Sequence, residues 1–337
     1  MMAGIKLLKI IDDIRKEDWA SFVYSHPRGN IFQTEEIYDV YKDTKNYLPI
    51  KLFCIDEDTG ELVGVLVGSL IKDLNNVLST YLSRSVIQGG PLALNNSSQI
   101  SESLLLEYDK YAGKKSVITE IRHLFDCPDL HNIGSYKFEG HLNFLINLNQ
   151  SEDQLWTQIH KSRRKNIKNA EKEGVIVEEM AEENLIPAFY DLLNETYRKV
   201  KTPLADISLF KSAFNKLVPK NMVKFFLLKR NNEYVGARSV LVYKGLVYDW
   251  YAGSSQEASF LSPDSCLVWH ILKWGIQNNY KTFDFGGGGK PNVEYGPREF
   301  KRRFGGELVN YGRSNKVHSG IKFGIAKKGL EIYRKIS

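Results

Sequence analysis

Alternating apolar and polar positions predict two β-hairpins that lie half a chain apart in the sequence. The first joins KLFCIDED (51–58) to GELVGVLV (60–67), and the second joins KFFLLKRN (224–231) to NEYVGARS (232–239). In each, a polar turn separates two strands, and a glycine lies near the start of the second strand. A helical stretch precedes each hairpin, and a strand with aromatic residues follows each. This repeated order predicts two copies of one α+β domain.

The segment between the two copies contains the expected domain boundary. Residues 138–148 (FEGHLNFLINL) alternate as in a strand. Ser151 then follows as a candidate N-cap for a helix that begins near Gln154. We therefore predict a first domain over residues 1–149 and a second over residues 150–315.

The end of the chain is basic and too short to form a domain. Residues 321–336 have the pattern of a helix, which we expect to pack back on one lobe. The basic and amphipathic stretch 321–330 leaves contact with anionic lipid headgroups as an alternative.

Composition narrows the class of protein. The 337 residues are 42% hydrophobic and 26% charged, which excludes a disordered or fibrous chain. A net charge of +6 favours an anionic ligand without indicating a nucleic-acid coat protein. Cys54, Cys127 and Cys266 lie far apart, so we expect neither a disulfide framework nor a zinc knuckle. With no signal peptide and no long apolar run, the expected location is the cytoplasm.

The densest charge lies in residues 160–172, where six basic residues stand against one acid. On a helix, these residues form either a solvated face or a surface that binds phosphate. Arginine forks match phosphate oxygens, so Arg163 and Arg164 are candidate binding residues.

A strand that ends in four glycines, residues 286–289, is the second candidate segment. It is either a flexible loop or a place where backbone approaches a ligand, with Gly287 and Gly288 lining an anion site. The order of residues differs from that of a nucleotide P-loop. Asp284, at the end of the strand, either assists orientation and proton transfer or caps the loop.

Two further segments offer side chains to a site. Phe300 and Phe304 are one helical turn apart and should anchor a short helix, which places Arg298 and Lys301 beside the glycine loop. A lysine held there could stabilise negative charge on a tetrahedral intermediate. In strand 247–255, alternation places Tyr248 and Trp250 on one side and Asp249 and Tyr251 on the other. Tyr251 is either a core residue or a hydroxyl in the cleft.

Other catalytic classes lack their motifs in this sequence. HExxH does not occur and the seven histidines are scattered, so we expect no metal site. GxSxG does not occur either, and no pairing of a nucleophile with a base is recognisable.

Taken together, the motifs resemble a known family. The order is R-x-x-N-I from Arg163, K-x-G-V from Lys172, FDFGG (283–287) and F-K-x-x-F-G-G (300–306). In this order and spacing the chain resembles the Fem-type peptidoglycan-bridge aminoacyltransferases and the related FemAB acyltransferases. The segments NIFQT (30–34), which contains Gln33, and VIQGGP (86–91) look like first-lobe motifs of the same group.

The resemblance implies two tandem GNAT-like domains, with mixed sheets flanked by helices and with residues 316–337 returning to the first lobe. No sustained heptad run is present, so the coiled-coil arm of some members is not expected. The family transfers an acyl group, in the best-known cases an amino acid from aminoacyl-tRNA, to an amine of a cell-wall precursor. Its lysine at the reaction centre corresponds to Lys301.

The resemblance also extends the expected site. By position, Tyr251 and Arg198 match family residues that bind the phosphates of the acceptor. The predicted catalytic residues are Lys301 and Asp284. The predicted substrate-binding residues are Tyr251, Arg198, Arg298, Phe300, Arg163, Arg164, Gly287, Gly288 and Gln33.

The donor remains open between two classes. The pyrophosphate loop [RQ]-x-x-G-x-[GA] of acetyl-CoA-dependent GNAT enzymes does not occur in the expected segments, which argues against CoA and for aminoacyl-tRNA. We expect no tightly bound cofactor. The alternatives are an acyl-CoA-dependent N-acyltransferase acting on a sugar amine in polysaccharide synthesis, and a non-catalytic protein that holds a nucleic acid or anionic glycan.

Overall fold

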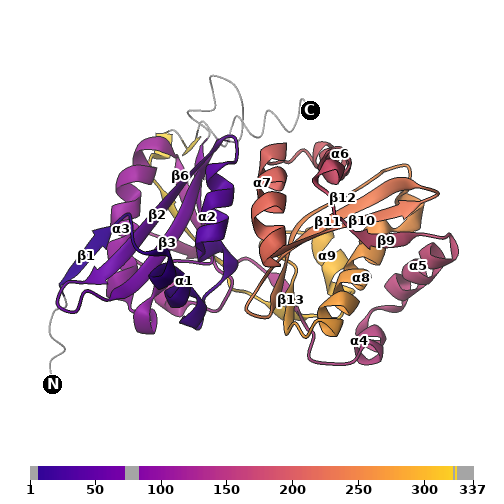
Figure 1. The fold of residues 1–337 in the computed structure, drawn as a ribbon, viewed down its shortest axis with the longest axis horizontal. Coiled ribbons are helices and arrows are strands. Elements are labelled where there is room, and N and C mark those ends of the chain that lie inside the picture. The colour runs from indigo at the N-terminus through magenta and orange to yellow at the C-terminus, as the bar shows by residue number, and fades with distance from the viewer. Residues whose placement is uncertain (1–6, 73–82, 322, 325–337) are drawn as a thin grey trace. The chain divides into compact units, whose positions relative to one another are not determined.

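The computed structural model describes residues 7–72, 83–321, 323 and 324, and its chain divides into two compact units (Figure 1). The first comprises residues 1–140 and 311–337, and the second residues 141–310. Residues 141–149 join the second unit because strand β8 (Asn143–Asn147) pairs with β13 (Thr282–Asp284) and β14 (Glu307–Val309). The boundary between the units therefore lies at residue 140, before β8. The sequence instead predicts a boundary near residue 150, after this strand.

The first unit is one mixed sheet with helices packed against it. The strand order is β1-β2-β3-β4-β6-β15-β7, with β5 paired to β3, and among these described strands only β4 and β6 run parallel. The predicted first hairpin is β2–β3. The strands are β1 (Leu8–Ile11), β2 (Tyr47–Asp56), β3 (Leu62–Ile71), β4 (Arg84–Gln88), β5 (Leu92–Ala93), β6 (Ile118–Arg122), β7 (Lys137–Glu139) and β15 (Arg313–Val317). The helices are α1 (Lys16–Ser25), α2 (Glu35–Lys42) and α3 (Ser98–Lys115).

Strand β15 brings the end of the chain into this sheet. It lies between β6 and β7 and pairs antiparallel with both. Lys316 Nζ donates to Asp109 Oδ2 at 2.6 Å, and a His318 ring nitrogen lies 2.7 Å from Thr119 Oγ1, so side chains also hold the strand. Most of the helix expected over residues 321–336 lies outside the described residues.

The second unit has a seven-stranded sheet in the order β14-β8-β13-β12-β11-β10-β9. The predicted second hairpin is β10–β11. The strands not yet given are β9 (Ile176–Glu179), β10 (Val223–Arg230), β11 (Glu233–Tyr243) and β12 (Leu246–Ser254). The helices are α4 (Glu152–Gln158), α5 (Lys161–Lys172), α6 (Ile186–Lys199), α7 (Ile207–Leu217), α8 (Pro263–Gln277) and α9 (Gly296–Arg302).

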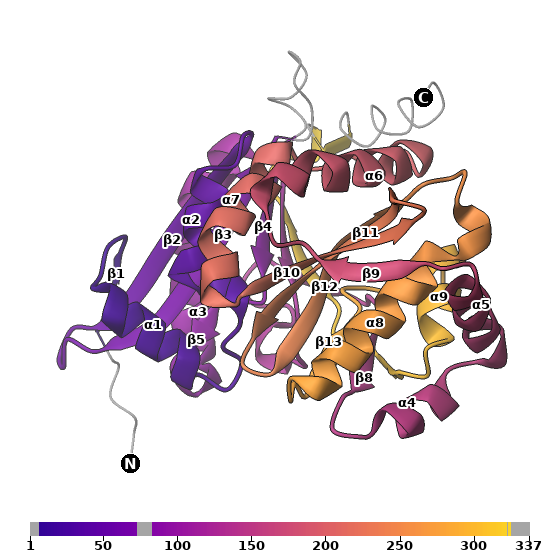
Figure 2. The same ribbon diagram turned by 45° about the vertical axis from the view of Figure 1, so that its right-hand side comes forward.

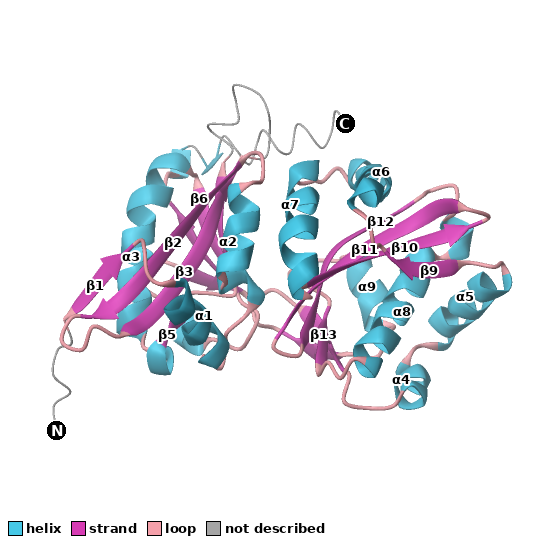
Figure 3. Cartoon of the chain, in the orientation of Figure 1, coloured by secondary structure: helices cyan, strands magenta, loops and turns pink. Residues whose placement is uncertain are grey.

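Helices cover both faces of the second sheet (Figures 2 and 3). Consecutive side chains of a strand point to opposite faces. Phe225 of β10 contacts Phe189 of α6 and Phe214 of α7, whereas Phe226 contacts His270 and Trp274 of α8. Helices α6 and α7 therefore pack on one face, and α8 packs on the other.

A β-bulge in β12 changes which face its side chains occupy. Tyr251 is opposite Ser239 and Asp249 is opposite Val240, so Trp250 is the extra residue. Trp250 and Tyr251 both contact Phe210 of α7, whereas Asp249 binds Arg238 on the α8 face. The predicted alternation, with Asp249 and Tyr251 on one side, was wrong because a bulge shifts the register by one residue.

Strands β12 and β13 separate soon after they begin to pair. They run parallel only from Leu246 to Tyr248 and from Thr282 to Asp284. Beyond Tyr248, β12 continues along β11 to Ser254. The bulge of β12 and the glycine segment after β13 therefore lie at the point where the two strands part. No helix in the described part of the chain is long and apolar enough to cross a bilayer.

Candidate functional site

Lys301 is held against the glycine segment by two backbone carbonyls. Its Nζ donates to Phe285 O at 2.6 Å and to Gly287 O at 2.7 Å. Helix α9 sets this position because Phe300 packs on buried Phe304, with ring centroids 5.3 Å apart. An ammonium has three N–H donors, so the two carbonyls leave one for a ligand. Burial lowers the pKa of Lys301, against the opposing effect of Asp249.

The four glycines form an anchored loop. Gly286, Gly287 and Gly289 have φ of +73°, +143° and +80°, which side-chain-bearing residues rarely adopt. Gly288 N donates to Leu142 O at 2.5 Å, and Leu142 N donates to Gly289 O at 2.8 Å. The Gly286 and Gly288 N–H groups are therefore bonded within the protein, and the loop presents carbonyls to the cations around it.

Arg298 clamps the same loop from α9. Its Nε donates to Gly288 O at 2.7 Å, and its guanidinium also binds Lys290 O and, at 3.3 Å, Pro291 O. The structure thus brings the predicted residues Arg298, Lys301, Gly287 and Gly288 together.

Asp284 caps the start of the glycine loop. It is 1% exposed, and its Oδ1 accepts hydrogen bonds from Asn143 Nδ2 and Gly286 N, both at 2.6 Å. Burial raises the pKa of Asp284 to about 6, while these two hydrogen bonds oppose the shift. The contacts of Oδ1 match the capping alternative that the sequence left open.

A buried arginine with two carboxylates completes the group of residues around Lys301. We call this group the Lys301 cluster: Lys301, Arg298, the glycine loop, Asp284, Arg238, Asp249 and Asp264. Arg238 is 4% exposed, and its guanidinium donates to Asp249 Oδ2 at 2.9 Å and to Asp264 Oδ1 at 3.0 Å. Burial raises the pKa of Asp249, whereas Arg238 and Lys301 act in the opposite direction. Asp249 Oδ1 is buried and has no hydrogen-bond partner within the described chain.

Sequence analysis missed Arg238, Asp249 and Asp264 as site residues. The available signal was Arg238 itself, a charge in the middle of an otherwise apolar strand, GARSVLV. A buried arginine requires charged or polar partners. Which carboxylates serve as partners depends on the bulge in β12 and on the start of α8.

Arg163 packs against α9 through the ring of Phe300. Its Cζ lies 4.4 Å from the centroid of the Phe300 ring, and its Nη1 donates weakly to Ser265 Oγ at 3.4 Å. Burial, followed by the charge of Arg303, lowers the pKa of Arg163. Arg163 therefore contacts α9 at Phe300, the residue that precedes Lys301.

The remaining cations of α5 form one stripe. Their spacing of three or four residues puts them on one helical face, opposite the buried Ile167 and Ala170. We call this set the α5 stripe: Lys161, Arg164, Lys165, Lys168 and Lys172.

Tyr251 and Arg198 lie on the α6 and α7 side of the sheet. The Tyr251 ring packs 4.9 Å from Phe210 and 6.0 Å from Tyr197, measured between centroids. Arg198 is exposed in the last turn of α6. Tyr251 thus faces away from Asp249 and Arg238.

Gln33 belongs to the first unit and is fully buried. Its Nε2 donates to Val67 O and Gln88 O at 3.0 and 2.9 Å, and its Oε1 accepts from Val67 N at 2.8 Å. A side chain whose amide is engaged in this way ties the segments around it together, and it is not part of the Lys301 cluster.

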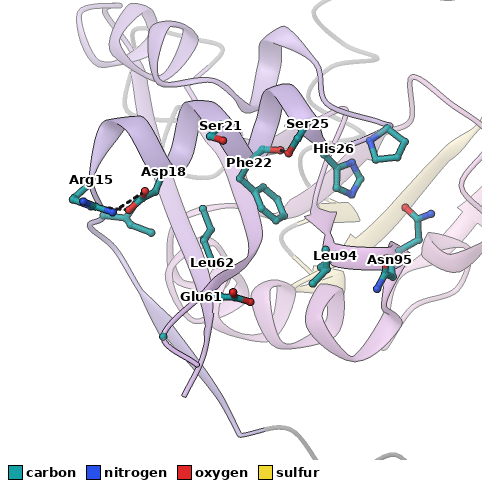
Figure 4. Close-up of a pocket in the computed structure, with 14 residues that line it drawn as sticks. Arg15, Asp18, Ser21, Phe22, Ser25, His26, Glu61, Leu62, Leu94 and Asn95 are labelled. Atoms are coloured by element: carbon teal, nitrogen blue, oxygen red, sulfur yellow. Dashed lines mark hydrogen bonds and ion pairs between the residues drawn. The ribbon is translucent and has the colours of Figure 1, made fainter. Parts of the chain in front are cut away.

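A separate pocket of about 690 Å³ lies beside α1 in the first unit (Figure 4). Its wall includes the Arg15–Asp18 ion pair and His26, whose ring nitrogen is 2.9 Å from Ala93 O. None of the predicted site residues lines it. Within residues 7–72, 83–321, 323 and 324, no group of three His, Cys, Asp or Glu side chains could hold a metal ion.

Comparison with known proteins defines the class. Residues 158–302 match the acetyltransferase (GNAT) domain family, and no curated protein matches the chain in sequence. This match covers α5 to α9 and contains Lys301, Arg238 and Asp249. The second unit is therefore a GNAT domain, and the protein is an acyltransferase.

Solved structures extend the likeness to the whole chain. FemX is 17% identical, with a TM-score of 0.69 over 92% of this chain and 97% of FemX. L-PGS from Bacillus licheniformis is 14% identical, with a TM-score of 0.58 over 98% and 99%. A tandem GNAT protein from the clavulanic acid biosynthesis pathway is 9% identical, with a TM-score of 0.57 over 93% and 99%.

The chain therefore has the tandem GNAT fold that FemX shares. This confirms, at the level of the fold, the resemblance to Fem-type transferases and the prediction of two tandem α+β domains. No helix in the described ranges is longer than the 18 residues of α3, so those ranges contain no long helical arm.

Proposed function

We propose that this acyltransferase joins an aminoacyl group, delivered as the ester of aminoacyl-tRNA, to an amine of a cell-wall precursor or a similar anionic glycan. The observation that carries the proposal is the Lys301 clamp. Two carbonyls fix the ammonium at 2.6 and 2.7 Å and leave one N–H for a substrate. This supports a role for Lys301 in binding the oxyanion that forms when an amine attacks an acyl carbon.

The reaction demands little beyond positioning. Aminolysis of an ester is downhill, and correct placement of amine and ester can remove roughly 7–11 kcal/mol of the barrier. Phe300, which contacts both Arg163 and Phe304, fixes the helix that carries Lys301. Arg298 fixes the loop whose carbonyls hold the ammonium. Both therefore serve the proposed site by orienting Lys301.

The α5 stripe supports a phosphate-rich partner. Its cations extend over about 16 Å of helix, and Glu171 is the one acidic residue of α5. A row of cations attracts a nucleic-acid backbone and releases counterions on binding. We assign it to the donor tRNA, with the diphosphate of an acceptor as the other anion that it could hold.

The start of α8 supports a donor other than CoA. Helix N-termini commonly bind pyrophosphate through free N–H groups. Here the first residue of α8 is Pro263, which lacks the N–H, and the second is Asp264, whose carboxylate is 41% exposed. A carboxylate at this position opposes binding of a further anion.

The matched acetyltransferase domain favours a second candidate, an acyl-CoA-dependent N-acyltransferase that acts on a sugar amine. Thermal stabilisation across acyl-CoAs, charged tRNA, uncharged tRNA and UDP-linked muramyl peptides separates the two. Responses to charged tRNA and a muramyl peptide, with none to CoA, are expected. A response to acyl-CoA alone would overturn the tRNA assignment, and no response to any of them would contradict both candidates.

The proposal also sets the location. Aminoacyl-tRNA is available in the cytoplasm, so the reaction takes place there, at the inner face of the membrane when the acceptor is lipid-linked.

A further inference from the structure

Besides Arg238 Nε, a buried donor without a partner among the described residues, two polar groups of the Lys301 cluster have hydrogen-bonding capacity that the protein does not use. One is the third N–H of Lys301, a donor. The other is Asp249 Oδ1, an acceptor that is buried without a partner among the described residues. An unpaired buried carboxylate oxygen costs free energy, so such a group calls for an explanation. A ligand with its own N–H would supply the missing bond.

The bulge in β12 is what brings Asp249 into the cluster. Without the extra residue Trp250, Asp249 would share the face of Tyr251 and lie toward α7. With it, the Asp249 side chain is 9% exposed, and Arg238 Nη1 holds Oδ2 at 2.9 Å. Asp249 Oδ2 is therefore bound by Arg238, whereas Oδ1 has no hydrogen-bond partner among the described residues.

Asp284, the other carboxylate of the cluster, is placed differently. Its Oδ1 accepts from both Asn143 and Gly286 N, and it is 1% exposed. Asp284 Oδ1 therefore stabilises the glycine loop, whereas Asp249 Oδ1 is buried without a partner among the described residues.

We propose that Asp249 Oδ1 binds the attacking amine and accepts its proton, while Lys301 binds the acyl oxygen. This inference rests on the proposed function and names a catalytic residue for it. Aminolysis requires a donor for the carbonyl oxygen and an acceptor for an amine N–H, and Lys301 Nζ and Asp249 Oδ1 have the capacity for these two bonds.

The proposed step balances as follows. The acceptor amine enters as an ammonium and gives one proton to the Asp249 carboxylate. Its nitrogen lone pair forms a bond to the acyl carbon, and the carbonyl electrons move to the oxygen, which Lys301 binds. The intermediate collapses, the bond to the ester oxygen breaks, and a second proton from the nitrogen goes to that leaving oxygen. Asp249 then releases its proton to solvent.

The charges around Asp249 suit a group that gains and loses a proton. They are Arg238 on β11, Asp264 on α8, Lys301 on α9 and Asp284 on β13. Burial raises the pKa of Asp249, and Arg238 and Lys301 keep the carboxylate form accessible. Protonation of Asp249 leaves Arg238 paired with Asp264 through its second nitrogen.

The test compares two nucleophiles in the Asp249→Asn variant of the full chain. The donor is a tRNA pool charged with labelled amino acids. The nucleophiles are a UDP-linked muramyl peptide, whose amine is protonated at neutral pH, and hydroxylamine, which is largely uncharged there. We expect the variant to lose about 10²- to 10⁴-fold in kcat with the peptide. With hydroxylamine, which needs no proton acceptor before attack, we expect a loss below about tenfold.

Asp264→Asn is the matched control because it removes the other carboxylate from Arg238. It should lose activity by the same factor with both nucleophiles, whatever the size of that factor, and the melting temperatures of both variants report on folding. Equal losses with the two nucleophiles in Asp249→Asn would overturn the inference and assign Asp249 a structural role. If the unmutated protein makes neither product, the proposed function itself fails, and the assignment of Asp249 fails with it.

Discussion

The Lys301 ammonium lies 2.6 Å from the carbonyl oxygen of Phe285, the residue at which β13 gives way to the glycine loop. A second carbonyl, that of Gly287, lies 2.7 Å from the same nitrogen. The loop thereby places a cation at a fixed point next to Asp249 and Asp284. This arrangement accounts for the pairing of the F-K-x-x-F and F-D-F-G-G motifs in one chain, because each motif positions the other.

Lys301→Ala should remove transfer and leave the fold intact. The loss of one oxyanion donor typically costs 10²- to 10³-fold in kcat, so we expect a loss of about that size in a product assay. Lys301→Arg keeps the charge and tests whether the compact ammonium is needed. Turnover equal to that of the unmutated protein would exclude Lys301 from the reaction.

Gly287→Ala should weaken the loop. Gly287 has φ of +143°, which strains any residue with a side chain, and an added Cβ would lie 3.3 Å from His141 Nε2. We expect lower kcat and a loss of about 1–3 kcal/mol in unfolding free energy, measured by denaturant titration. Gly296→Ala is the control because a Cβ there meets nothing within 4 Å. Equal behaviour of the two variants would contradict the anchored loop.

The pH dependence of stability should report Asp284. Its pKa is raised by burial to about 6 in the folded protein, from 3.8 for the unperturbed group. The folded state therefore binds more protons between pH 4 and 6, and stability should fall as pH rises through this window. The change is at most about 3 kcal/mol.

In Asp284→Asn, this component should disappear, because the amide does not titrate and its oxygen can still accept from Asn143 and Gly286. Denaturant melts from pH 4 to 7 measure the difference between the two proteins. Parallel curves for the variant and the unmutated protein would show that Asp284 does not titrate in this range.

Charge reversal on the α5 stripe should weaken binding of the donor. Lys165→Glu with Lys168→Glu replaces two exposed cations, and each lost phosphate contact lowers the salt slope of tRNA binding by about 1. Lys211→Glu with Lys220→Glu also reverses two exposed cations, so it changes the net charge by the same amount and serves as the control. The same loss in stripe and control variants would show a non-specific effect of net charge.

Much of this fold follows from local sequence patterns. The two hairpins are predictable because alternation and turn residues specify them within about 20 residues. The helix that carries Phe300 and Lys301 is likewise set by a single turn of spacing. Lys301 and the glycine loop therefore follow from the sequence as one cluster.

The rest of the site depends on relations that no local pattern contains. One extra residue in β12, Trp250, turns Asp249 to the opposite face of the sheet. Arg238 of β11 donates a hydrogen bond to Asp264 of α8, which is distant in the sequence. Gln33 shows the converse, since a motif residue expected at substrate has an amide that binds backbone at Val67 and Gln88. Packing of distant segments decides such assignments.

The most direct test of the central claim is one transfer assay. The unmutated protein and Lys301→Ala are incubated with a UDP-linked muramyl peptide and charged tRNA, and the mass of the peptide is followed. We predict a mass gain of one aminoacyl group with the unmutated protein and a strongly reduced rate with the variant. No mass gain with charged tRNA, together with acylation of an amine by acyl-CoA, would contradict the account.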